Sequence, residues 1–238
     1  MIQLFGSISS NPGTIGKYYY SEFFKYYGIN AKYDSVKAGD IKEAISFLEN
    51  NLYSGFNISM PFKSQIINYL DYAAPDVSLY NSCNTIKFQD NELHGYNTDI
   101  FGALKIVDSI AESDYVVVLG NGAMGKMIAK VLQHRNIEFE IISRSLSNWD
   151  KRHQSCDVLI NCTSLGTSVL ESPINEILGT HSVYDLTFKG YELQKKCKSI
   201  KYFSGIFFYK EVFLKQFMFH TSISPDAEYF DFLTRIRR

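Results

Sequence analysis

Three clusters of polar residues, 57–63, 81–85 and 97–99, each stand beside a run that predicts a β-strand. Asparagine and hydroxyl side chains at strand ends can bind a polyhydroxylated ligand. A lysine and an aspartate at the same place can form a proton-transfer pair, as Lys63 and Asp99 could. Each cluster taken alone is equally typical of turns and helix caps. Only their joint occurrence favours a functional site.

A glycine-rich loop follows the apolar run 115–119 and precedes a segment with helical spacing, 126–134. Strand, Gly-x-Gly-x-x-Gly and helix in this order are the context of a dinucleotide-binding fingerprint. The first glycine permits a tight turn, the second lets a pyrophosphate approach, and the third permits close helix packing. Free amide groups at the helix start would bind the phosphates. The predicted coenzyme-binding residues here are Gly120, Asn121, Gly122, Ala123, Met124 and Gly125.

The end of the next predicted strand, 138–142, indicates which coenzyme is used. An NAD enzyme usually has an acidic residue there, which accepts a hydrogen bond from the ribose 2′-hydroxyl. This chain instead has Ser143, Arg144 and Ser145. A guanidinium flanked by hydroxyls suits a 2′-phosphate in charge and geometry, and the basic pair 151–152 adds positive potential. The sequence therefore favours NADP, although Arg144 could also be a solvated surface residue.

The elements that must position these groups alternate between strands and helices. Before residue 100, short predicted strands such as 56–59 alternate with helical segments at 17–27 and 63–70, and Asp90-Asn91 predicts a hairpin turn. Beyond it, apolar strands alternate with helices, the pattern of a parallel, doubly wound sheet. From residue 207 on, the pattern is mostly helical, with a break near Pro225.

The overall composition excludes several classes of protein. The chain has 238 residues, 45% of them apolar, which is enough for a core in one large or two small domains. A net charge of −1 gives no reason to expect nucleic acid or an anionic membrane as partner. The start lacks the features of a secretion signal, and no apolar run reaches membrane-spanning length. The 4 cysteines lack metal-ligand spacing. We therefore expect a metal-free cytoplasmic protein that binds neither nucleic acid nor a membrane, and the composition leaves open whether it is a monomer or a homodimer.

In this order the motifs resemble those of the shikimate dehydrogenase family over essentially the whole chain. The family's N-V-T-x-P-x-K is similar to residues 57–63, its A-V-N-T to 82–85, its G-x-N-T-D-x-x-G to 95–102, its glycine loop to 120–125, its N-R-T to 143–145, and its N-x-T-x-x-G-M to 161–167. The match at 95–102 is complete. The resemblance implies an α/β fold with an N-terminal α/β substrate domain, residues 1–102, completed by C-terminal helices in 206–238. It also implies a Rossmann-type NADP-binding domain, residues 103–205, and a reaction in the interdomain cleft.

The resemblance also implies roles for individual residues. Lys63 would be the acid/base, and Asp99 would be its partner. The implied substrate-binding residues are Thr14, Asn57, Ser59 and Asn84. Thr163 and Gly205 would join the coenzyme-binding residues named above.

The chain departs from the family in residues that would bind the substrate. The family's S-x-S falls on Thr14-Ile-Gly16, which keeps one hydroxyl and loses the other. The tyrosine of D-x-x-Y-x-P is Phe188, and the glutamine of G-x-x-M-L-x-x-Q is Val212. Each lost donor could cost about 1 kcal/mol or more. The pattern resembles the shikimate dehydrogenase-like branch, whose members share S-M-P-F-K.

We therefore expect an NADP-dependent oxidoreductase that interconverts 3-dehydroshikimate and shikimate, in chorismate and aromatic amino acid biosynthesis. A first alternative keeps the chemistry but changes the ligand to quinate or another cyclic hydroxy acid. A second is a non-catalytic NADP-binding paralogue. The lost recognition residues favour that second alternative, and the retention of Lys63 and Asp99 argues against it.

Overall fold

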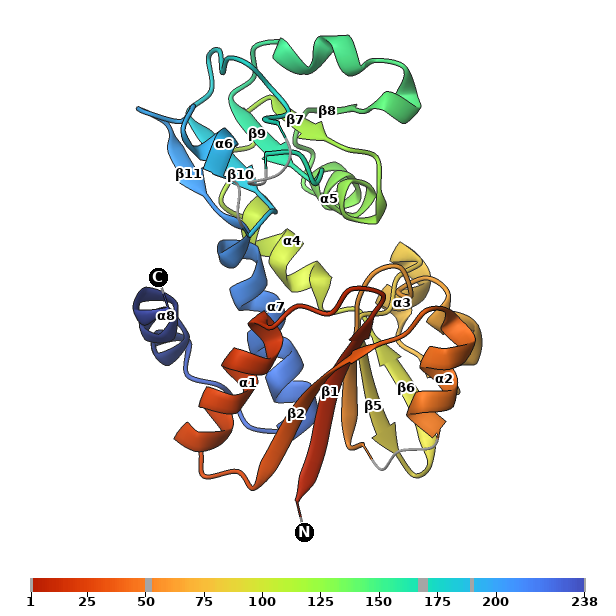
Figure 1. Ribbon diagram of the computed structural model, residues 1–238. Coiled ribbons are helices and arrows are strands. Elements are labelled where there is room, and N and C mark those ends of the chain that lie inside the picture. The colour runs from red at the N-terminus through yellow and green to blue at the C-terminus, as the bar shows by residue number, and fades with distance from the viewer. Residues whose placement is uncertain (1, 50–52, 167–170, 189–190, 238) are drawn as a thin grey trace. The chain divides into compact units, whose positions relative to one another are not determined.

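The computed structural model describes residues 2–49, 53–166, 171–188 and 191–237, coloured along the chain in Figure 1. The last residue of the motif at 161–167 and the two residues after Phe188 lie outside these ranges. The chain divides into two compact units, Met1–Asp99 with Val212–Arg238, and Ile100–Glu211. Each unit combines one sheet with helices, so the predicted α/β class is confirmed. Which unit binds the substrate and which binds the coenzyme stays a prediction.

The first unit contains a six-stranded mixed sheet in the order β2-β1-β3-β5-β6-β4. Its strands are β1 (Gln3–Ser9), β2 (Ala31–Lys37), β3 (Gly55–Ile58), β4 (Tyr72–Ala73), β5 (Thr85–Gln89) and β6 (Glu92–Tyr96). β1 pairs in parallel with β2 and β3, whereas β5 is antiparallel to both β3 and β6. Asp90 and Asn91 form the predicted hairpin turn with φ angles of 52° and 65°. Aspartate and asparagine tolerate this left-handed conformation better than most residues.

Helices cover both faces of this sheet (Figure 1). They are α1 (Ile15–Tyr26), α2 (Ile41–Glu49), the 3₁₀ turn η1 (Ile66–Tyr69), α3 (Pro75–Tyr80) and the later part of α7 (Gly205–Thr221). Helix α8 (Ala227–Ile236) packs against α1 and α7. Aromatic rings join α1, α7 and α8: Tyr19 stacks on Phe230 at 4.3 Å, and Phe23 meets Phe213 edge-on at 4.9 Å. On the other side, aliphatic residues of α2 pack with η1, α3 and the sheet in a separate apolar core.

The helix predicted at 63–70 is wrong in extent. Only Ile66–Tyr69 is helical, as a single 3₁₀ turn. Leu70 is already extended, with ψ at 136°. The chain must straighten here because Tyr72 and Ala73 join the edge of the sheet beside β6.

The second unit contains a five-stranded sheet in the order β11-β10-β9-β7-β8, and every pair in it is parallel. Its strands are β7 (Val116–Leu119), β8 (Phe139–Ile142), β9 (Val158–Asn161), β10 (Ser182–Asp185) and β11 (Lys201–Phe203), and its helical elements are α4 (Asp99–Val107), α5 (Ala123–His134), η2 (Arg144–Leu146), η3 (Trp149–His153), α6 (Tyr191–Gln194) and the start of α7. The central strands β7, β9 and β10 are buried along their whole length. Burial on both faces explains the continuous apolar run of β7, whereas β9 and β10 also bury the polar residues Asn161, Ser182 and Asp185. The predicted parallel sheet is confirmed.

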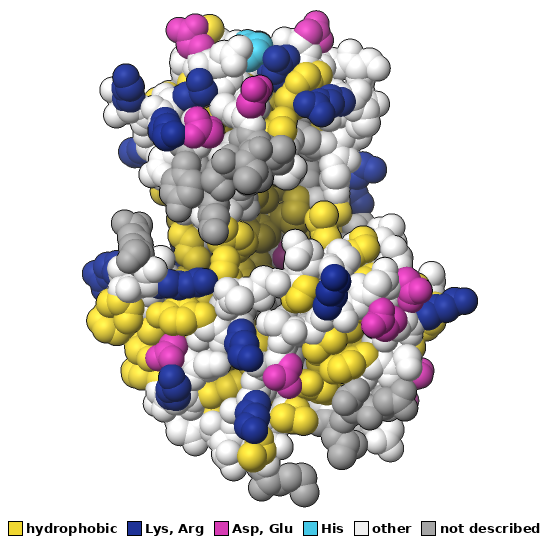
Figure 2. Space-filling view, viewed as in Figure 1, with side chains coloured by type: hydrophobic (Ala, Val, Ile, Leu, Met, Phe, Trp, Pro, Cys, Tyr) yellow, Lys and Arg dark blue, Asp and Glu magenta, His cyan; other side chains and the backbone are white. Residues whose placement is uncertain are grey.

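Charged side chains are dispersed over the face shown in Figure 2, where lysines and arginines alternate with acidic residues. Among the described residues, no helix combines the length and the apolar character that crossing a bilayer requires. The same part of the chain contains no group of His, Cys, Asp and Glu side chains placed to hold a metal ion.

Candidate active site

Lys63 and Asp99 meet in the first unit. Lys63 Nζ donates a hydrogen bond of 2.6 Å to Asp99 Oδ2. The lysine lies between β3 and η1, and the aspartate is the first residue of α4. The side chain of Asp99 is 5% exposed and that of Lys63 is 24% exposed, so the carboxylate is enclosed while the ammonium keeps access to solvent. Among the described residues Asp99 is the acceptor for this ammonium, which leaves N–H groups for a ligand.

Asn84 lies in the same region of the sheet. Its backbone carbonyl accepts a hydrogen bond from Ile58 N at the end of β3, and its backbone amide donates to Tyr96 O at the end of β6. The neighbouring amide of Cys83 donates to Lys63 O over 2.8 Å. These backbone bonds bring together the three polar clusters singled out in the sequence.

Asn57, a predicted substrate-binding residue, is enclosed by other side chains instead. Its Oδ1 accepts a hydrogen bond of 2.8 Å from His220 Nε2, and its Nδ2 donates to the hydroxyls of Tyr33 and Tyr20 at 2.9 and 3.4 Å. Because side chains alternate along a strand, Asn57 faces α1 and α7, while Phe56 and Ile58 face the aliphatic core. Both ends of the Asn57 amide are therefore hydrogen-bonded to other side chains of the first unit. No local pattern in the chain marks His220 as its partner.

Thr14 and Ser59 are exposed, and among the described contacts neither hydroxyl has a protein partner. Both therefore stay candidates for substrate binding. Val212, which stands where the family has a glutamine, is buried at 4% exposure. In the second unit, Phe188 is 45% exposed and meets the ring of Tyr209 edge-on at 5.3 Å.

The three glycines of the loop in the second unit differ in backbone conformation and in the space around them. Gly120 has φ at +102°, and a methyl group there would lie 3.1 Å from Thr163 Cγ2. A methyl group on Gly125 would run into the carbonyl oxygen of Gly120. Gly122 is the N-cap of α5 and has open space where a side chain would be. The first amides of α5, at Ala123 and Met124, lack partners inside the helix and can therefore bind an anion.

Ser143, Arg144 and Ser145 lie beside this loop. Asn121 Nδ2 donates to Ser145 Oγ at 3.5 Å, and the two serine hydroxyls are 2.9 Å apart. Arg144 is exposed, and its guanidinium lies 5.5 Å from the ring centroid of Trp149. Nothing in the local sequence pattern indicates that Trp149, in η3, lies next to Arg144.

The two further basic residues expected to add positive potential have other partners. Lys151 Nζ lies 3.3 Å from Glu140 Oε1. Arg152 donates to the backbone carbonyls of Pro173 and Trp149 at 3.1 and 2.9 Å. Arg144, by contrast, has no acidic or carbonyl partner among the described residues.

Thr163 and Gly205 have structural contacts near the ends of the parallel strands. Thr163 Oγ1 donates to Asn161 Oδ1 at 2.7 Å and accepts from Leu165 N at 3.2 Å, which closes a turn after β9. A methyl group on Gly205 would lie 2.6 Å from Leu186 O, so only glycine lets α7 begin this close to the end of β10.

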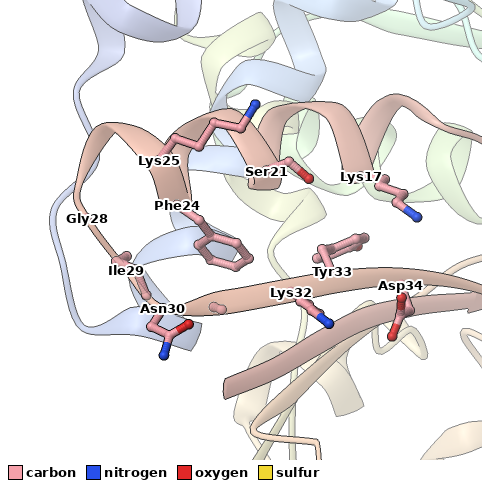
Figure 3. A pocket seen from close by; sticks show the side chains of 11 residues that line it. Lys17, Ser21, Phe24, Lys25, Gly28, Ile29, Asn30, Lys32, Tyr33 and Asp34 are labelled. Atoms are coloured by element: carbon pink, nitrogen blue, oxygen red, sulfur yellow. The ribbon is translucent and has the colours of Figure 1, made fainter. Parts of the chain in front are cut away.

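A separate groove of about 500 Å³ lies between α1 and β2 in the first unit. Figure 3 shows Lys17 and Ser21 on the helix opposite Lys32 and Tyr33 on the strand. None of the predicted site residues lines this groove.

Together, the fold and the site define a two-unit α/β protein with a dinucleotide-type glycine loop and a lysine–aspartate pair. A family model described as the shikimate dehydrogenase substrate binding domain matches residues 16–86. The shikimate dehydrogenase (NADP(+)) of Pyrococcus furiosus is 31% identical over 190 residues, which cover 71% of this chain and 70% of the relative. A shikimate dehydrogenase-like protein of Haemophilus influenzae is 27% identical over 180 residues, 69% of this chain and 66% of the relative. The chain belongs to the shikimate dehydrogenase family.

Solved structures agree with this fold. The crystal structure of shikimate dehydrogenase 1 from Peptoclostridium difficile superposes with a TM-score of 0.86 and 21% identity, covering 99% of this chain and 98% of that one. The enzyme from Thermus thermophilus, in complex with NADP(H) and shikimate, has a TM-score of 0.78 and 19% identity, covering 98% and 99%. At these identities the likeness establishes the fold alone.

Proposed function

We propose that the protein is an NADP-dependent oxidoreductase that acts on a CH–OH group, with shikimate and 3-dehydroshikimate as its substrate pair. The observation that carries the proposal is the 2.6 Å hydrogen bond between Lys63 and Asp99. An ammonium held by an enclosed carboxylate, yet still reachable from solvent, is suited to exchange a proton with a ligand. The names and coenzyme of the relatives support the same activity.

The residues present fit NADP. Gly122 leaves space for a pyrophosphate beside the start of α5, and the three residues after β8 include no acid that would repel a 2′-phosphate. Arg144 offers a guanidinium that makes no ion pair within the described chain. We assign coenzyme binding to the second unit and substrate binding to the first.

The protein's own residues account for the proton in the proposed reaction. Bound NADPH supplies the hydride for reduction of the ring carbonyl. The Lys63 ammonium donates a proton to the oxygen as negative charge develops there, and the amine takes it back in the oxidative direction. Asp99 keeps the lysine in position. Asn84 and the exposed hydroxyls of Thr14 and Ser59 are the proposed contacts to the ring substituents.

One observation favours a second candidate substrate. The positions of Phe188 and Val212 carry no hydrogen-bond donor, so a ring acid would be held by fewer contacts than in the family pattern. Quinate or another cyclic hydroxy acid would then be the substrate, with the same proton and hydride transfers. A non-catalytic role would leave the Lys63–Asp99 pair without a purpose.

Absorbance of NADPH at 340 nm tests these proposals. Purified protein is assayed with shikimate and with quinate, each with NADP and with NAD. Oxidation of shikimate with NADP at an ordinary kcat/KM supports the first proposal, and a preference for quinate supports the second. Binding of NADPH without turnover of either acid would contradict both.

A further inference from the structure

A buried chain of hydrogen-bond donors leads from α7 to Asn84. We propose that Gln216 is a positioning residue that holds the side chain of Asn84 with its NH₂ group towards the substrate. The substrate atom that Asn84 meets must then be a hydrogen-bond acceptor, such as a hydroxyl, carbonyl or carboxylate oxygen. This inference rests on the proposed role of Asn84 in substrate binding.

The orientation of the Asn84 amide follows from a backbone group. Thr98 N lies 2.8 Å from Asn84 Oδ1, and a backbone N–H can only donate, so the atom that faces it is the oxygen. The hydroxyls of Thr85 and Thr98 donate to the same oxygen at 2.8 and 3.0 Å. With three donors the oxygen is fully occupied. Nδ2 has no partner among the described residues. Unlike Asn97 Nδ2, it is not fully enclosed, so a ligand can reach it.

The orientation of Gln216 follows in the same way. Its amide nitrogen lies 3.4 Å from the backbone oxygen of Asn84, which can only accept. The same nitrogen lies 3.3 Å from Thr85 Oγ1. Because Thr85 Oγ1 accepts from Gln216, its own hydrogen is left for Asn84 Oδ1 at 2.8 Å, the shorter of its two remaining contacts, or for Thr98 Oγ1 at 3.1 Å. Gln216 therefore supports, through Thr85, the orientation of Asn84 that the Thr98 amide also favours.

Because these side chains are buried, reversing the orientation of their hydrogen bonds is energetically unfavourable. Gln216 is 5% exposed, Asn84 2% and Thr85 0%. Water cannot readily replace a lost partner at such sites, and an unpaired buried polar group is unfavourable. The bonds of Gln216 are long, so their main effect is on the orientation of Thr85 and Asn84 and less on stability.

The donor chain has a consequence for specificity. Asn84 Nδ2 and the Lys63 ammonium can both only donate, and Cys83 N links their backbones through a 2.8 Å bond to Lys63 O. A ring oxygen with free lone pairs satisfies Asn84, whereas a ring ammonium would place a second donor against it. We therefore infer that substrates carry oxygen at the position that Asn84 contacts.

A double-mutant cycle tests the inference on activity. Gln216→Met keeps the side-chain length and removes the donor, and Thr85→Val keeps the shape and removes the hydroxyl. Each is expected to raise KM for the ring acid about five- to tenfold, with a smaller change in kcat and an unchanged KM for NADPH. Because both act through Asn84, the double variant should lose no more than the more damaging single variant. Fully multiplicative losses would overturn the proposal.

A second measurement does not depend on turnover. The side-chain NH₂ signals of Asn84, assigned in ¹⁵N spectra by comparison with Asn84→Asp, should form one sharp pair in the parent protein. In Gln216→Met they should shift or broaden as the amide samples the reversed orientation. Unchanged signals in a folded variant would refute the positioning role, even if no ring acid were turned over. Absence of turnover with the expected spectral change would refute only the proposed function.

Discussion

Lys63 Nζ and Asp99 Oδ2 are 2.6 Å apart, although 36 residues separate them in the chain. If this pair transfers the proton, Lys63→Ala should lower kcat by about 100- to 10,000-fold with a modest change in KM. Steady-state kinetics with the ring acid in excess measures this. The matched control is Lys17→Ala, which removes a lysine of the α1–β2 groove and should leave kcat unchanged. A near-normal kcat in Lys63→Ala would remove the lysine from the mechanism.

Arg144 should determine the choice of coenzyme. Arg144→Ala removes a guanidinium that lies over Trp149 and has no acidic partner among the described residues. We expect the ratio of kcat/KM for NADP to that for NAD to fall roughly 10- to 100-fold, the effect of losing a charged hydrogen bond. Lys151→Ala is the control, since Lys151 already pairs with Glu140. An equal fall of the ratio in both variants would show that general positive potential, and not Arg144 itself, selects the coenzyme.

Two glycines of the loop should respond to alanine in opposite ways. Gly122→Ala places a methyl group in open space, so the free energy of unfolding should change by less than about 1 kcal/mol, while the Kd for NADPH rises about tenfold or more. Gly125→Ala forces a methyl group against the Gly120 carbonyl and should cost about 1–3 kcal/mol of stability. Urea denaturation and fluorescence titration with NADPH separate the two effects. Normal NADPH binding by Gly122→Ala would place the pyrophosphate elsewhere.

His220 should make the protein sensitive to acid. Burial lowers the pKa of His220 from 6.5 to about 3, and Lys87 contributes to the shift. Between these two values the unfolded chain binds a proton that the folded chain does not. Stability is therefore fully present above pH 6.5 and is lost as the pH falls towards 3. At pH 5 the loss is on the order of 2 kcal/mol relative to neutral pH.

The variant His220→Gln tests this effect. Glutamine can still donate to Asn57 Oδ1 but does not titrate. The difference in unfolding free energy between pH 7 and pH 5, from urea denaturation, should be smaller in the variant by about that amount. Identical pH dependence in both proteins would mean that His220 does not carry the acid sensitivity.

The sequence alone determined the features that depend on residues close to one another along the chain. The continuous apolar run at 115–119 predicted β7, because a strand buried on both faces favours apolar residues. The alternation of strands and helices predicted β9 and β10, although their buried positions include the polar Asn161 and Asp185. Asp90-Asn91 predicted the hairpin, since it suits a left-handed turn. The spacing of the glycines predicted the strand–loop–helix unit, and the motif order predicted the family.

Only the tertiary structure decided how distant polar groups pair. Asn57 is of a residue type that often binds ligands, yet its side chain forms a hydrogen bond with His220, 163 positions away. Gln216 reaches Asn84 across 132 positions. Trp149 and the short strands β4 and β11 likewise have no local signal. Strand order and helix packing set such contacts, and a polar side chain is enclosed or left open according to which distant residues the folded core brings against it.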